Sequence, residues 1–189
     1  MTTYLMAIFY FFIPEIFSPI GNELIPRFLL TVLITTAVLP MLFVSMMKMA
    51  ALIPSLEMTR RQDRIIPFIS ILIFYSGACY IFISKLAIAP PLSAMMIGTT
   101  LLIFSLLIVT LKFKISIHAS AIWACSGMMA ALSIKYTGMV LLVPLSTMLV
   151  LGGIVSASRL SLQVHSGSEI WSGIITGFVF GFATVFWFT

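Results

Sequence analysis

The stretch PLSAMMIGTTLLIFSLLIVTL, residues 91–111, contains no charged side chain. A helix that spans the hydrocarbon core of a bilayer needs about 20 predominantly apolar residues, and this run meets that requirement. Its apolar residues are continuous, whereas a strand of a membrane barrel would alternate apolar and polar positions. The stretch therefore predicts a membrane-spanning α-helix.

The rest of the chain has the same apolar character. Of its 189 residues, 61% are hydrophobic and 8% are charged, and the mean hydropathy is +1.22. An average soluble domain carries about 25% charged residues. We therefore expect an all-α, polytopic integral membrane helix bundle with six to seven transmembrane helices, forming a single membrane domain over residues 1–189. Cys79 and Cys125 lie inside apolar runs, which predicts buried hydrophobic side chains and no metal site.

Hydropathy predicts seven apolar segments along the chain. The first is short and is interrupted by Pro14 and Glu15, so it either spans the membrane or lies in the interface. Pro40 predicts a kink in the second segment, and the Pro90-Pro91 pair predicts a turn before the fourth. The segments cover residues 4–19, 27–53, 65–84, 91–111, 118–134, 138–157 and 170–188.

Three polar windows separate these segments, and counting helices places all three on the same side of the membrane. They read SLEMTRRQDR, KFKISIH and SRLSLQVHSGSE. Basic residues that flank membrane helices on the cytoplasmic side account for the lysines and arginines, but not for the histidines or for Glu169. The opposite side carries Arg27, Lys85 and Lys135. The side that holds the windows collects most basic residues and both histidines of the protein, namely Lys48, Arg60, Arg61, Arg64, Lys112, Lys114, Arg159, His118 and His165.

The third window carries the clearest chemical pattern. His165 and Glu169 are four residues apart, so on a helix they share one face. The carboxylate can accept the proton of one ring nitrogen, which leaves the other nitrogen as a base or nucleophile. Arg159 carries a planar guanidinium that suits phosphate oxygens. Each residue also has a structural interpretation: a hydrogen bond at a helix start for His165 and an interfacial snorkel for Arg159.

The other two windows add groups that suit an anion. Ser116 and His118 open the fifth segment, where a hydroxyl and the amides of a helix start favour negative charge. A second histidine near the first would allow one to attack while the other protonates a leaving group. Arg61 and Arg64 supply positive charge for a multiply charged group. We interpret Arg60 as an ordinary membrane-flanking charge.

These residues resemble the signatures of the type 2 phosphatidic acid phosphatase superfamily. Ser158, Arg159, His165 and Glu169 match its third signature, Ser-Arg-x5-His-x3-Asp, with Glu in place of Asp. Residues 115–118, Ile-Ser-Ile-His, are similar in part to its second signature, Pro-Ser-Gly-His. The resemblance covers about residues 57–175 and is that of a divergent, small bacterial branch.

The first signature of that superfamily, Lys-x6-Arg-Pro, is matched least. Arg64 stands for its arginine, Glu57 occupies the lysine position, and the proline comes late, at Pro67. Arg61 or Arg60 is a candidate replacement for the lysine.

The resemblance implies a membrane phosphatase without metal or cofactor that hydrolyses a phosphomonoester or pyrophosphate of a lipid. His165 would form a phosphohistidine, Glu169 would orient it, and His118 would protonate the leaving lipid oxygen. The phosphate oxygens would be bound by Arg159, Arg64, Ser116 and Arg61. The resemblance also implies a bacterial inner membrane with the site on the periplasmic side, whereas the basic excess favours the cytoplasmic side. Membrane lipids are the expected partners, nucleic acid is not, and the oligomeric state stays open.

Three other functions remain open from the sequence alone. A non-catalytic relative that binds lipid headgroups or scaffolds other membrane proteins would keep its function when His165 is replaced. A transporter or flippase would call for polar residues at mid-membrane or broken helices with repeat symmetry, and the apolar segments disfavour it. Phosphotransfer to a second lipid would use the same residues as hydrolysis.

Overall fold

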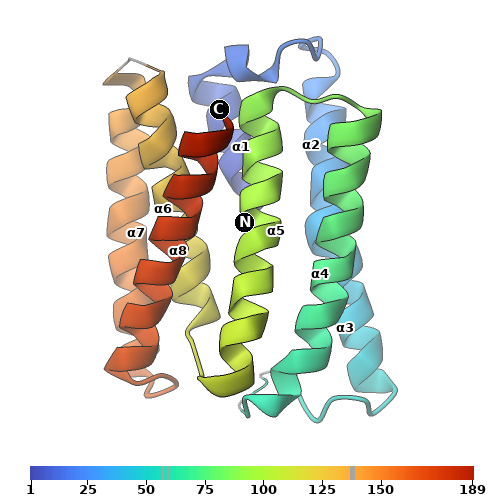
Figure 1. Ribbon diagram of the computed structural model, residues 1–189, viewed down its shortest axis with the longest axis vertical. Helices are drawn as coiled ribbons and strands as arrows, with labels where there is room; N and C mark the ends of the chain where they lie inside the picture. The colour runs from blue at the N-terminus through green and yellow to red at the C-terminus, as the bar shows by residue number, and fades with distance from the viewer. Residues whose placement is uncertain (57, 59, 137–138) are drawn as a thin grey trace.

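The structure is a computed structural model that describes residues 1–56, 58, 60–136 and 139–189, and these residues form helices without any strand. The helical spans stand side by side and are joined by short connections at the two ends of the bundle (Figure 1). Within the described residues, six spans are long and apolar enough to cross a membrane: Ile25–Met49, Gln62–Lys85, Pro90–Lys112, Ile117–Lys135, Leu142–Ser161 and Gly167–Phe188. The chain is therefore an all-α polytopic membrane bundle, which confirms the predicted fold class.

The first full span consists of α2 (Ile25–Leu33), a π-helical turn η2 (Ile34–Val38) and α3 (Leu39–Met49). Pro40 explains the turn, because a proline inside a helix lacks an N–H donor and its ring crowds the carbonyl four residues earlier. At the end of this turn the N–H of Leu39 donates to the carbonyl of Ile34, five residues back. The predicted disturbance at Pro40 thus takes the form of one widened turn, a common way for a helix to absorb a local misfit.

The remaining spans begin and end close to the predicted bounds. They are η3 (Gln62–Arg64) with α4 (Ile65–Tyr80) and a second π turn η4 (Ile81–Lys85), then α5 (Pro90–Lys112), α6 (Ile117–Lys135), η5 (Met139–Leu141) with α7 (Leu142–Ser161), and α8 (Gly167–Phe188). Pro90 begins α5 instead of lying in a turn before it, a position that suits proline because its missing N–H has no helical partner there.

The first apolar segment forms a half-span that packs against the bundle on one face, so it is too short for the full span that was one of its two expected forms. Helix α1 (Thr2–Phe12) is about 16 Å long, half of a hydrocarbon core of about 30 Å. It starts near mid-height of the bundle and rises to the end where η1 (Pro14–Phe17) lies (Figure 1). Leu5, Met6 and Phe9 on α1 are at most 1% exposed.

Helices α6 and α8 pack so closely that their backbones nearly touch. Gly173, Gly177 and Gly181 recur every four residues on α8 and face α6, as in the small-residue stripes that let membrane helices approach. A Cβ atom at Gly173 would lie 2.8 Å from the carbonyl oxygen of Ser116. One at Gly177 would collide with the carbonyl oxygen of Ser120. Only glycine therefore fits at this contact.

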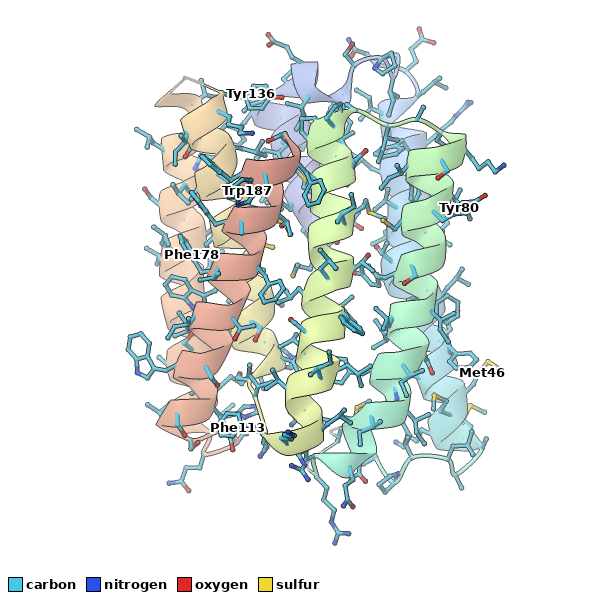
Figure 2. All side chains as sticks on the ribbon, viewed as in Figure 1. Met46, Tyr80, Phe113, Tyr136, Phe178 and Trp187 are labelled. Carbon is cyan, nitrogen blue, oxygen red and sulfur yellow. The ribbon has the colours of Figure 1, made fainter. Side chains whose placement is uncertain are left out.

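The three polar windows lie at one end of the bundle, as counting the helices predicts. The α3–α4, α5–α6 and α7–α8 connections all lie at the lower end in Figure 1, and α1 and α8 end at the upper one. Figure 2 shows Phe113 and Met46 toward the lower end and Tyr80, Tyr136 and Trp187 toward the upper end.

Exposed tryptophans mark both ends of α8. Trp171, near its start, and Trp187, near its end, are 65% and 81% exposed. Tryptophan is enriched where hydrocarbon meets headgroups, so these two side chains indicate the membrane boundaries.

Replacing Gly177 by alanine tests the contact between α6 and α8. The added methyl group would force the two backbones apart, and overpacking of this kind costs about 1–3 kcal/mol. We expect the melting temperature of the purified protein in detergent to fall.

Gly153→Ala on α7 is the matched control, because nothing lies within 4 Å of a Cβ atom there. Equal melting temperatures for Gly177→Ala and the wild-type protein would contradict the close contact.

Candidate functional site

The starts of α6 and α8 are fastened to each other by their backbones. The N–H of Ser116 donates to the carbonyl oxygen of Glu169 over 3.1 Å. The hydroxyl of Ser120 in turn donates to the carbonyl oxygen of Ser116 over 2.9 Å. The bond between Ser116 and Glu169 places the second polar window against the third, although about 50 residues separate them.

Two serine caps fix where these helices begin. Ser116 caps α6 by accepting from the N–H of Ala119 at 3.5 Å, and Ser166 caps α8 by accepting from the N–H of Glu169 at 3.4 Å. A serine cap followed three residues later by glutamate is a common start of a helix. Here the glutamate side chain points to His165, the residue just before the cap, instead of turning back to the backbone of the cap.

His165 and Glu169 form a close pair at this helix start. Nδ1 of His165 lies 2.6 Å from Oε2 of Glu169, and the two side chains are 4% and 16% exposed. Because a carboxylate only accepts, Nδ1 carries the donated hydrogen and Nε2 is left without one when the ring is neutral. The two residues pair, as the sequence predicts, but they do not share a helix face, because His165 lies before the cap Ser166 and outside α8.

The pair adjoins a pocket at the end of the bundle that holds the polar windows. Its volume is about 270 Å³, and it brings together four of the predicted site residues: Arg64, His118, Arg159 and His165. They come from the starts of α4 and α6, the end of α7 and the α7–α8 connection. The remaining lining is mostly apolar and consists of Leu56, Met58, Pro67, Phe68, Ile71, Ile117 and Val164.

Arg64 is held in place by two backbone carbonyls. Its Nη1 donates to the carbonyl oxygen of Ile115 over 3.2 Å, and its Nε donates to that of Met58 over 2.9 Å. Arg64 is 5% exposed. Since a guanidinium has five N–H donors, these two bonds leave others for a ligand. The bond to Ile115 also joins the first polar window to the second.

Lys114 belongs to the site although sequence reasoning did not include it. Its Nζ donates to the carbonyl oxygen of Val164 over 3.1 Å and lies 4.0 Å from Oε2 of Glu169. It therefore joins the α5–α6 connection to the α7–α8 connection, next to the pair formed by His165 and Glu169. The only feature of the sequence that could have assigned Lys114 to the site is its position two residues before the cap Ser116. Many lysines that flank membrane helices have a similar position, so this feature is not specific.

Other predicted phosphate-binding residues lie apart from the pocket. Ser116 is fully buried and serves as the cap of α6. Among the described residues, neither Ser116 nor Arg61 is one of those that line the pocket. Glu57, which stands at the lysine position of the first signature, lies outside the described residues.

The surroundings of His165 favour its neutral form. Burial lowers the pKa of His165 below the ordinary value of 6.5, and Arg64 and Lys114 lower it further. The hydrogen bond and the negative charge of Glu169 oppose this by raising the pKa, but burial has the larger effect. At neutral pH the imidazole therefore keeps a lone pair on Nε2, as a nucleophile requires.

The described part of the chain does not meet the requirements of a metal site. No group of three His, Cys, Asp or Glu side chains there lies close enough to hold a metal ion. Both cysteines are free; Cys125 is buried, as predicted, whereas Cys79 is only partly buried. No protein-family model, curated protein or solved structure matches the chain.

Titration of His165 tests the electrostatics of the pair. We expect a pKa below 6.5 in the wild-type protein, a lower one in Glu169→Gln, which removes a charge that raises it, and a higher one in Lys114→Met, which removes a charge that lowers it. Imidazole ¹⁵N shifts followed by NMR against pH give these values, with the His118→Gln variant assigning the signals. A wild-type pKa above 6.5, or one unchanged in Glu169→Gln, would contradict the arrangement.

Proposed function

We propose that this protein is an integral membrane phosphatase that hydrolyses a phosphomonoester or pyrophosphate of a lipid through a phosphohistidine. The observation that carries the proposal is the pairing of His165 with Glu169 beside a pocket that also holds His118, Arg64 and Arg159. The chain has two histidines, and both line this one pocket.

In the first step, the lone pair on Nε2 of His165 attacks the phosphorus atom. An N–P bond forms and the P–O bond to the lipid breaks, with its electron pair passing to the lipid oxygen. His118, which the negative charge of the bound phosphate keeps protonated, gives that oxygen a proton, so the lipid leaves as an alcohol or as the lower phosphate. Glu169 accepts the hydrogen bond from Nδ1 and stabilises the positive charge that develops on the ring of His165.

In the second step, water replaces the histidine on phosphorus. His118, now neutral, takes a proton from the attacking water. The N–P bond breaks, and its electron pair returns to Nε2 of His165. Inorganic phosphate leaves, and both histidines regain their starting protonation states. The two steps together consume one water for each phosphate released.

The two arginines supply the positive charge that this reaction needs. Arg64 is fixed by its bonds to the carbonyls of Ile115 and Met58, so it would meet the phosphate oxygens without reorganising. Arg159, in the last turn of α7, would bring a second guanidinium to the same pocket. Lys114 positions the pair by holding the α7–α8 connection through the carbonyl of Val164.

Phosphate release by the purified protein tests this proposal. The assay uses detergent micelles, EDTA and a panel of phosphorylated lipids that includes phosphatidic acid, phosphatidylglycerol phosphate, a polyprenyl pyrophosphate and lipid A. We expect release by the wild-type protein and none by His165→Ala. His118→Ala should slow release by about 10²–10⁴-fold, the usual contribution of general acid–base catalysis.

Arg60→Ala is the matched control for that assay. Arg60 is an exposed basic residue of the polar window that contains Arg64, and it does not line the pocket. It should release phosphate at the wild-type rate. Phosphate release that persists in His165→Ala would overturn the phosphohistidine. A wild-type protein that binds these lipids and releases nothing would indicate a headgroup-binding or scaffold protein.

We further propose that the site faces the periplasm from a bacterial inner membrane, which follows from the resemblance of the signatures. Gln163, exposed in the α7–α8 connection, is a suitable position for a reporter cysteine. A membrane-impermeant thiol reagent should label Gln163→Cys in intact spheroplasts. Labelling only after lysis would place the site in the cytoplasm, the side that the basic residues favour.

A further inference from the structure

A second pocket adjoins the histidine pocket on its membrane side. Its volume is about 460 Å³, and its walls come from the α2–α3 span, α4, α5 and α6. Five residues line both pockets: Leu56, Met58, Phe68, Ile71 and Ile117. With this much shared lining, a molecule bound in one pocket extends directly into the other.

The two pockets together run one leaflet deep. Along α4, Arg64 lines the histidine pocket and Tyr75 lines the far end of the apolar one, eleven residues and thus about 16 Å away. A hydrocarbon core is about 30 Å thick, so the far end lies near the bilayer midplane. Thr36 and Thr99 line the same end, from the π turn and from the middle of α5.

The start of α1 closes the pocket at that depth. Met1 is among its lining residues, and the hydroxyl of Thr2 donates to that of Thr99 over 3.1 Å. Both threonine hydroxyls at this end are already engaged: Thr36 donates to the carbonyl oxygen of Val32 over 2.7 Å. Thr99 likewise donates to the carbonyl oxygen of Met95 over 2.8 Å. Neither threonine therefore requires a polar group on a ligand.

We propose that this apolar pocket holds one hydrocarbon chain of the lipid whose phosphate occupies the histidine pocket, and that the start of α1 sets the greatest chain length it accepts. The inference rests on the proposed function for the position of the phosphate. The joined pockets have a polar end with two arginines and an apolar end, and together they are one leaflet deep. This shape matches an amphiphile lying along the bilayer normal. Met41, 68% exposed on α3, lines the pocket and gives the chain a lateral way in from the bilayer.

Binding of alkyl phosphonates of increasing chain length tests this inference without any catalytic turnover, because a P–C bond is not hydrolysed. Each buried methylene contributes about fourfold in affinity. We therefore expect the dissociation constant, measured with purified wild-type protein by native mass spectrometry, to fall by up to that factor per carbon. The fall should stop once the chain reaches the start of α1. Alkanols of the same length should bind more weakly at every chain length.

Two alanines that line the pocket allow the length limit to be moved. Ala121 lies one turn past His118 on α6, near the phosphate end, and Ala37 lies beside Thr36 at the closed end. Ala121→Phe should stop the gain in affinity at a much shorter chain, and Ala37→Phe at a slightly shorter one. Ala183→Phe is the matched control, since Ala183 lines a separate groove between α5 and α8. Unchanged butyl phosphonate binding in every variant shows that the headgroup site and the fold persist.

Three results would overturn the inference: an affinity that never levels off with chain length, equal binding of alkanols and phosphonates, or the same effect from all three variants. Its failure is distinguishable from failure of the proposed function. Phosphate release without a chain-length limit keeps the enzyme and removes the tail pocket. A chain-length limit that responds to Ala37→Phe and Ala121→Phe, in a protein that releases no phosphate, keeps the tail pocket and removes the catalysis.

Discussion

The backbone contact between α6 and α8 holds the site together. Glycines on α8 let the two helices approach until the N–H of Ser116 reaches the carbonyl oxygen of Glu169. His118 lies two residues after Ser116, and Glu169 is hydrogen bonded to His165. A single backbone contact therefore sets the relative position of both histidines. Apolar attraction between helices is weak in lipid, which makes close packing and interhelical hydrogen bonds the main means of fixing such positions.

The site joins a charged and an apolar environment within one turn of α4. Arg64 is buried, and the backbone carbonyls of Ile115 and Met58 solvate its guanidinium. One turn deeper along α4, Phe68 and Ile71 belong to both pockets. The change from charged to apolar surroundings therefore takes place within a few ångströms, as it does between the phosphate and the chain of a lipid.

The spans and the pairing of His165 with Glu169 were predictable, since hydropathy and four-residue spacing are local properties of the sequence. The half-span α1 was not, because a short apolar run that ends at Pro14 and Glu15 does not show how deep its helix lies, and only packing of Leu5, Met6 and Phe9 against the bundle reveals its depth. Ser116 was assigned to phosphate because a cap and a ligand site share the same sequence pattern. The hydrogen bond of Lys114 to Val164 depends on two connections meeting in space, so no spacing could indicate it.

The tryptophans on α8 also define a height for the molecule. Trp171 and Trp187 are sixteen residues apart on one helix, which separates them by about 24 Å along its axis. A bilayer whose hydrocarbon core exceeds the apolar belt of the bundle must thin locally or draw the protein's ends below its headgroups. Arg159 and His165 stand at one of those ends, close to the level of Trp171. Hydrophobic mismatch would therefore change the hydration of the pocket, so the thickness of the surrounding membrane acts directly on the electrostatics of the site.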